Sequence, residues 1–454
     1  MADPTAAGRR VGGTEHSWCR GVPGGTGVLV LAFHLSRPVP RPLLESALHR
    51  LQTSQPLLRS RLTTATPDQP FFSIAHSPSL TVRPLAASNI LPSPPASPSH
   101  FHSLLEHELN ENPWSSSAPS HPILFATAYD DMPELGRTVV ALRFHSAACD
   151  RTSAAAILKE LLRLIAGSTK EEEEEEQEEF HQAIEDLIPK QDARKPFWAR
   201  GKDLVGYSLN GLRTSTLPFE DAGSDRRSEV VRLVLGVDDT QKLLNACKVR
   251  EIKLCGAMSA AALVATNASK HLEKDRAETY SVVTLIDCRK YLDPVLHDHS
   301  LGSYHSAVIN THDVHGGEEL WEVAKRCHES YSNAVHNKKH LKDITELNFL
   351  LCKAIDNPQL TPSSSQRTAL ISVFEEPVVY DSSELQQEVG VEDYLWCASV
   401  HGAGPSIAVF DTIRDGRLDC AFVYPSPLHS RKQMQELVEH MKTILTQGSL
   451  NGGD

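Results

Sequence analysis

His145-Ser146-Ala147-Ala148-Cys149-Asp150 is a short turn between two segments of different periodicity. Residues 138–144, which precede it, are rich in β-branched and apolar side chains and predict a buried strand. A helix is expected directly after the turn, with Thr152 or Ser153 as its cap and Gly167 at its end. The apolar residues on one face of that helix are Ile157, Leu161, Leu164 and Ile165. A polar turn held between a strand and a helix is the setting that an exposed catalytic motif requires.

The segments before this turn predict the rest of a first lobe. Residues 27–35 form an apolar run suited to a buried strand, and residues 41–52 follow as an amphipathic helix. Residues 123–129 predict a further strand that is joined by a turn to the strand before the motif. The first lobe is therefore expected to span 1–188, with the acidic block near 170–180 as a solvated linker or helix face.

The C-terminal half repeats this arrangement. A mixed crossover segment is expected at 189–228, followed by a second lobe over 229–454. The expected helices are 240–250, 255–271 and 431–447, and the expected strands are 229–235, 280–286, 304–310, 368–374, 406–411 and 418–424. The last two strands can pair through a hairpin at Asp415-Gly416. Strands mixed with helices on this scale predict an α/β protein of two related lobes.

Composition excludes several classes of function. The chain of 454 residues has a formal net charge of -13, which argues against a nucleic acid or an anionic membrane as its main partner. Its nine cysteines are scattered and never spaced as CxxC, a pattern typical of reduced thiols in the cytosol. Without a long apolar run or a signal pattern, no membrane span and a cytoplasmic location are expected. Because HExxH and glycine-rich phosphate loops are missing from the sequence, we expect no metal, nucleotide hydrolysis or hydride transfer.

Several short strings occur in an informative order along most of the chain. Besides the central turn they are Gly12-Gly13-Thr14-Glu15, Pro56-Leu57-Leu58-Arg59, Val283-Thr284-Leu285-Ile286-Asp287-Cys288-Arg289, Gly302-Ser303-Tyr304 and Gly416-Arg417-Leu418. In this order they resemble the superfamily of HxxxD-type acyltransferases, nonribosomal condensation domains and chloramphenicol-acetyltransferase-like enzymes. In particular, the chain is similar to a plant branch described as HxxxD-type acyl-transferase or condensation-domain-containing proteins.

The central motif departs from the pattern of that superfamily, which reads HHxxxDG. Ser146 stands in the place of the second histidine and Arg151 in the place of the glycine, so the motif is degenerate. The DFGWG string of the plant alkaloid and phenolic acyltransferases is also missing, and Phe374-Glu375-Glu376-Pro377 occupies roughly that place. Condensation domains lack that string too.

The resemblance implies two chloramphenicol-acetyltransferase-like lobes, mixed sheets flanked by helices, with an inter-lobe channel and the motif at its midpoint. It also implies acyl-CoA or a carrier thioester as co-substrate, no tightly bound cofactor, and a monomer. Asp150 would be structural and would form an ion pair with Arg289 from the second lobe. Arginine suits that role because its planar guanidinium group can donate two parallel hydrogen bonds to one carboxylate.

The missing histidine bears directly on activity. In the superfamily the second histidine is the general base, and a serine hydroxyl such as that of Ser146 is unsuited to this task because its pKa lies far from neutral. One hypothesis is that a bulge turns His145 toward the channel and makes it the catalytic base. The alternative is that His145 is a packed structural residue. Substitute imidazoles are available in the second lobe at His305, His312 and His401, although each is better explained as structural.

Cys149 lies inside the motif and raises the question of a nucleophilic thiol. Its apolar neighbours and the lack of an adjacent base in the sequence favour a buried, inert thiol. Two functions therefore remain open. The first is an acyltransferase that moves an acyl group from acyl-CoA or a carrier thioester to a hydroxyl or amine of a small-molecule acceptor. The second is a catalytically lapsed condensation-domain relative that acts as a binding or scaffolding module.

Overall fold

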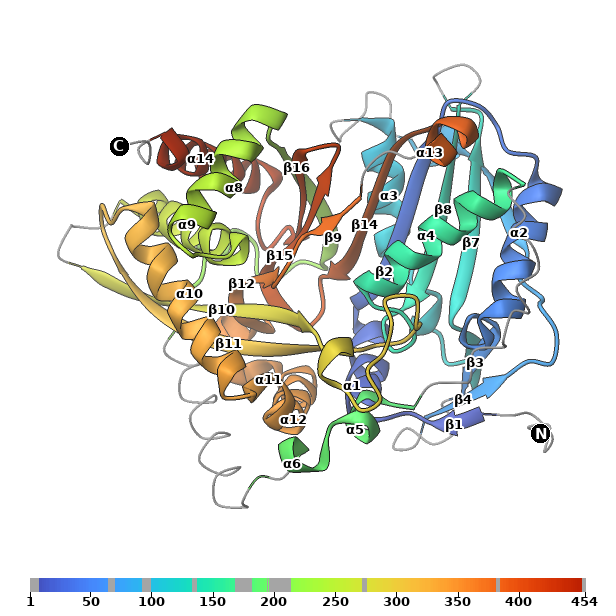
Figure 1. Cartoon of the computed structure of the whole chain (residues 1–454), viewed down its shortest axis with the longest axis horizontal. Helices are drawn as coiled ribbons and strands as arrows, with labels where there is room; N and C mark the ends of the chain where they lie inside the picture. The colour runs from blue at the N-terminus through green and yellow to red at the C-terminus, as the bar shows by residue number, and fades with distance from the viewer. Residues whose placement is uncertain are drawn as a thin grey trace. The chain divides into compact units, whose positions relative to one another are not determined.

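The computed structural model describes residues 8–63, 70–91, 99–132, 137–167, 182–193, 195, 214–271, 276–380 and 384–450 (Figure 1). The chain divides into two compact units, which are not consecutive in sequence. Unit 1 consists of Met1–Leu187, Arg289–Tyr304 and Ser382–Ser399, and unit 2 consists of Ile188–Cys288, His305–Asp381 and Val400–Asp454. The lobes expected from the sequence, 1–188 and 229–454, are consecutive ranges. Unit 1 differs from the first of them because it also includes two stretches from later in the chain. The acidic block near 170–180 lies outside the described residues.

Unit 1 is built on a five-stranded sheet with the order β14-β2-β8-β7-β5. Its strands are β2 (Thr26–Leu35), β5 (Val82–Ala86), β7 (Leu124–Asp130), β8 (Thr138–His145) and β14 (Val391–Val400). β8 pairs antiparallel with both β2 and β7, and every residue of β2 and β8 is buried. Strands buried along their whole length are expected when both faces of a sheet are covered.

Helices of unit 1 cover this sheet (Figure 1). α2 and α4 pack against each other, and α3 contacts β2 and β8. The helices are α1 (Gly13–Gly21), α2 (Arg41–Ser54), α3 (His100–Asn110), α4 (Arg151–Ile165), α5 (Ile184–Leu187) and α13 (Glu384–Val389). A smaller four-stranded sheet in the order β1-β4-β3-β6 consists of β1 (Gly8–Arg10), β3 (Ser60–Thr63), β4 (Phe71–Ile74) and β6 (Ser120–Pro122).

Unit 2 is built on a seven-stranded sheet. Its main order is β11-β10-β12-β15-β16-β9, with β13 paired to β15. The strands are β9 (Arg227–Val234), β10 (Ala277–Asp287), β11 (His305–His315), β12 (Arg367–Phe374), β13 (Val378–Val379), β15 (Gly404–Arg414) and β16 (Arg417–Ser426). Asp415 and Gly416 have φ values of 49° and 72°, as a tight two-residue hairpin between β15 and β16 requires.

Helix α9 (Leu254–Ser269) lies at the centre of the helical layer of unit 2. It packs against α10 (Leu320–His336) and α14 (Arg431–Leu450). Nearly all of α9 is buried, because small residues on all its faces allow close approach. The other helices of unit 2 are α6 (Lys190–Ala193), α8 (Val237–Val249), α11 (Lys339–Lys342) and α12 (Ile344–Asp356). In the part of the chain described here, no helix is both long and apolar enough to span a membrane.

The expected α/β fold is confirmed, and each expected strand and helix is present with somewhat different ends. The expected cap of α4 is wrong. Asp150 is the N-cap, and its side chain accepts a hydrogen bond from the backbone N–H of Ser153. A carboxylate satisfies a free N–H at a helix start as well as a hydroxyl does, and its charge also suits the positive end of the helix dipole.

Candidate functional site

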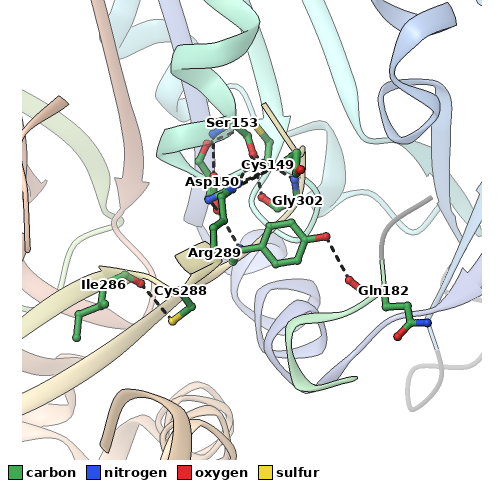
Figure 2. Close-up of polar contacts among 10 residues, drawn as sticks. Cys149, Asp150, Ser153, Gln182, Ile286, Cys288, Arg289 and Gly302 are labelled. Atoms are coloured by element: carbon green, nitrogen blue, oxygen red, sulfur yellow. Dashed lines mark hydrogen bonds and ion pairs between the residues drawn. The ribbon is translucent and has the colours of Figure 1, made fainter. Parts of the chain in front are cut away.

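The turn after β8 is organised around the carboxylate of Asp150 (Figure 2). Arg289 donates from Nη1 to Asp150 Oδ2 and from Nη2 to Oδ1, both at 3.0 Å. The same carboxylate accepts from the backbone N–H groups of Ser153 and Tyr304, each at 2.9 Å. The expected ion pair is therefore present with two parallel hydrogen bonds. Arg289 was expected from the second lobe, but it lies in the Arg289–Tyr304 stretch of unit 1.

Arg289 is only 2% exposed, and its remaining donors are also used. Nη2 donates to Ser153 Oγ and to the Ser300 carbonyl at 3.0 Å, and the guanidinium lies 5.0 Å from the centre of the Tyr304 ring. A buried charge is tolerated when it is both paired and fully hydrogen-bonded. The contacts of Asp150 and Arg289 therefore form one satisfied network at the start of α4.

Gly302 and Ser153 connect the Arg289–Tyr304 stretch to the turn. Asp150 N–H donates to the Gly302 carbonyl at 3.0 Å, and the Gly302 N–H donates to Ser153 Oγ at 3.1 Å. A Cβ on Gly302 would lie 2.4 Å from the Tyr304 ring, so only glycine fits here without movement. The string Gly302-Ser303-Tyr304 was visible in the sequence, but its contact with the motif was not predicted, because about 150 residues separate the two along the chain.

His145 lies at the end of β8 and is buried, with 1% of its surface exposed. Its Nδ1 accepts a hydrogen bond from the Ala147 N–H at 3.1 Å, and its ring meets Trp114 edge-to-face with 5.3 Å between ring centres. Burial, with a smaller contribution from His121, lowers the pKa of His145 to about 3. The ring is therefore neutral at physiological pH, and one of its two nitrogens is already occupied.

Ser146, at the position of the second motif histidine, is held against the backbone of β2. Its Oγ donates to the Gly27 carbonyl at 2.7 Å, and its N–H donates to the same oxygen at 3.2 Å. Gly27 has a φ of +92°, and a Cβ there would lie 2.8 Å from Trp18 and 3.0 Å from Ser146 Oγ. The site thus requires a glycine on β2 opposite a small hydroxyl side chain.

The other candidates from the sequence are also buried or packed. Cys149 is 1% exposed, and burial raises its pKa well above the usual range, so it remains a protonated thiol. His312 and His401 lie in unit 2, where burial lowers the pKa of each to about 4. The ring of His305 meets Phe374 edge-to-face at 5.6 Å. Among the residues that the structure describes, no group of three or more His, Cys, Asp or Glu side chains could hold a metal ion.

Sequence comparison finds no matching family model and no matching curated protein. Comparison with solved structures gives full-length matches. The trichothecene 15-O-acetyltransferase of Fusarium sporotrichioides matches with a TM-score of 0.72 and 13% identity, over 97% of this chain and 94% of that one. Polyketide synthase associated protein 5 of Mycobacterium tuberculosis matches with a TM-score of 0.67 and 15% identity, over 98% and 100%.

The chain has the chloramphenicol-acetyltransferase-like fold. The X-domain from teicoplanin biosynthesis has this fold too, with a TM-score of 0.63 and 16% identity over 100% of this chain and 97% of that domain. A further solved structure is a complex of the X-domain with OxyB. The chloramphenicol-acetyltransferase-like fold thus occurs both in a named acetyltransferase and in a domain captured with a protein partner.

Proposed function

We propose that this chain is a catalytically lapsed member of the chloramphenicol-acetyltransferase-like fold that acts as a binding or scaffolding module. One observation carries the proposal: the motif holds no accessible imidazole. The second motif position is Ser146, whose hydroxyl donates to the Gly27 carbonyl, and His145 is 1% exposed.

The chemistry of acyl transfer explains why this observation matters. A general base must reach the proton of the attacking hydroxyl or amine and have a pKa near the working pH. The pKa of His145 is lowered to about 3, and its Nδ1 accepts from the Ala147 N–H. A serine hydroxyl has no comparable basicity, and the buried thiol of Cys149 is protonated. None of the three side chains meets the requirements for a base or for an activated nucleophile.

The retained network around Asp150 is compatible with this proposal. It caps α4, neutralises a buried guanidinium and connects Arg289–Tyr304 to the turn. Each of these contributions stabilises unit 1 whether or not an acyl group is transferred. A scaffold that is present without the base is therefore compatible with a binding module built on an enzyme fold.

The competing function is acyl transfer from acyl-CoA or a carrier thioester to a hydroxyl or amine, with His145 as the base and Asp150 and Arg289 as the scaffold. Its support is the full-length similarity to an acetyltransferase together with the intact ion pair. It requires His145 to leave its contact with Trp114 and to release the Ala147 N–H. That movement would cost a buried hydrogen bond and an aromatic contact.

Turnover assays distinguish the two functions. Purified protein is incubated with a mixture of acyl-CoA thioesters and a library of alcohols and amines, and free thiol and acylated products are measured. His145→Asn is the matched variant, because the Asn Oδ1 can still accept from the Ala147 N–H. We expect thiol release at the level of the buffer blank for both proteins. Turnover by the wild type that His145→Asn abolishes would establish the acyltransferase, and turnover that both proteins retain would require another base.

A further inference from the structure

Two arginine side chains of unit 2 share one backbone carbonyl. Arg367, the first residue of β12, donates from Nε to the Ser365 carbonyl at 3.2 Å. Arg226, directly before β9, donates from Nη1 to the same oxygen. The two positive charges are therefore held close together, and their repulsion makes it less favourable for each guanidinium to stay protonated.

Arg367 has one donor group without a partner. Its Nη1 donates to the carbonyls of Val400 and Pro405 at 2.9 Å and 2.6 Å. Nη2 is buried, as is the whole residue at 2% exposure, and it has no hydrogen-bond partner in the described part of the chain. A buried charged donor without a partner is costly, so such a group in a folded protein calls for an explanation.

Neither guanidinium has a carboxylate partner among the residues that the structure describes. Within the described parts of the chain, no ion pair involves Arg367 or Arg226, and the charged group that acts on Arg367 is Arg226. Burial and Arg226 lower the pKa of Arg367 to about 9. Two other buried arginines are paired with a carboxylate: Arg289 pairs with Asp150 at 3.0 Å, and Arg143 Nε lies 3.0 Å from Glu108 Oε2.

Two histidine rings lie close to the same arginines. His401 follows Val400, and its Nδ1 lies 3.0 Å from Ser228 Oγ. His429 is fully buried, and its Nδ1 lies 3.0 Å from Gln433 Oε1. Burial lowers the pKa of both rings to about 4, and the charge of Arg367 acts on each in the same direction. The positive charge of the cluster therefore comes from the two arginines, and among the described residues no carboxylate pairs with either of them.

The turn that presents the shared carbonyl is also unusual. Ser363, Ser364 and Gln366 have φ values of 50°, 54° and 58°, a left-handed region that residues other than glycine rarely adopt. Backbone strain of this kind is retained when the surrounding structure requires it, often at binding sites. Here it positions the Ser365 carbonyl between the two arginines.

We propose that this cluster is a binding site for a small oxyanion group, a phosphate or a carboxylate, received by Arg367 Nη2 and Arg226. Such a group supplies both a hydrogen-bond acceptor for Arg367 Nη2 and a negative charge that neutralises the arginines. The planar guanidinium group matches the geometry of both anions. A water molecule would supply the acceptor without the charge. A metal cation is excluded here by the two guanidinium groups.

Thermal unfolding and isothermal titration calorimetry test the site with inorganic phosphate and acetate, at constant ionic strength set by chloride. Arg226→Gln is the main variant, since it removes the charge and keeps a polar side chain, and Arg226 is only half-buried, so the fold should survive. Arg417→Gln, at an exposed position of the β15–β16 hairpin, removes the same charge elsewhere. Because phosphate also stabilises proteins generally, saturable binding and the difference between variants are the decisive readouts.

We expect saturable binding of at least one of the two anions to the wild type and to Arg417→Gln. Arg226→Gln should weaken that binding by about tenfold, the usual effect of losing one charged hydrogen bond. The anion that binds more tightly identifies the group that the site prefers. Non-saturable effects with both anions, or equal affinity in Arg226→Gln and the wild type, would overturn the proposal.

Discussion

Ser146 Oγ donates to the carbonyl oxygen of Gly27 at 2.7 Å, so the side chain at the second motif position is bonded to the neighbouring strand. Gly27 has a positive φ of +92°, and Trp18 lies against its α-carbon. The same contacts that pack β2 at Gly27 therefore also hold the Ser146 side chain at the motif position where a base would be needed.

This arrangement makes Gly27 sensitive to substitution. Gly27→Ala adds a Cβ that would lie 2.8 Å from the Trp18 ring and 3.0 Å from Ser146 Oγ, in a backbone conformation that alanine disfavours. We expect a loss of about 1–3 kcal/mol in the free energy of unfolding, measured by urea denaturation. Gly24→Ala is the control, because a Cβ there meets nothing within 4 Å. Equal stability of the two variants would contradict the packing described for Gly27.

The Asp150–Arg289 pair should be important for stability. Asp150→Asn keeps a good helix cap but leaves Arg289, which is 2% exposed, without a negative partner. We expect it to lower the free energy of unfolding by about 3–5 kcal/mol, the usual effect of breaking one half of a buried ion pair. In a double-mutant cycle, adding Arg289→Met to Asp150→Asn should cost much less than Arg289→Met costs alone. Additive effects would show that the two charges act independently.

Stability should fall as the solution is acidified below the normal histidine pKa. His145 titrates near 6.5 when unfolded, but its pKa in the folded protein is about 3. The unfolded state therefore binds a proton first, and the stability that the neutral ring provides above pH 6.5 is lost as the pH falls toward 3. His312, His401 and His429, with pKa values near 4, act in the same direction.

Each of these histidines can contribute a slope of up to about 1.4 kcal/mol per pH unit between its two pKa values. Urea denaturation between pH 7 and pH 4.5 measures the total slope. His145→Asn should reduce it, and His315→Asn, at an exposed position, is the matched control substitution. An unchanged slope in His145→Asn would argue against a buried neutral ring.

Cys149 should resist alkylation in the native protein. Burial holds its pKa well above the usual range and leaves 1% of its surface exposed, so little thiolate forms at pH 8. Brief treatment with iodoacetamide followed by peptide mass spectrometry should find Cys149 unmodified and Cys352, which is partly exposed, modified to a greater extent. Preferential labelling of Cys149 would instead mark it as an activated thiol.

The sequence predicted the framework of the fold well, because long strands and amphipathic helices have strong periodicity. β2, β8 and α4 could be located from their apolar patterns, and the pairing of Asp150 with Arg289 from the family resemblance. Short strands such as β1 and β6 have too few residues to show a pattern. The β14 strand joins the sheet of unit 1 from late in the chain, a long-range pairing that local sequence does not encode.

The candidate site was harder to predict than the fold. Whether His145 faces solvent or the core depends on its contact with Trp114, a residue about thirty positions earlier that the motif does not reveal. The cluster at Arg367 depends on four segments of unit 2 that meet only in the folded chain, and neither arginine lies in a recognisable motif. Residue types alone could not show that a carboxylate partner is missing.

The ionisation of His145 is the most direct test of the proposed loss of catalysis. Nuclear magnetic resonance of protein with isotope-labelled histidine, with His145→Asn used to assign the signal, measures the pKa of this ring. With a pKa of about 3, the His145 signal should stay constant between pH 5 and pH 8. A titration midpoint near 6.5 would mean that the ring reaches solvent and is available as a base, which would contradict the account.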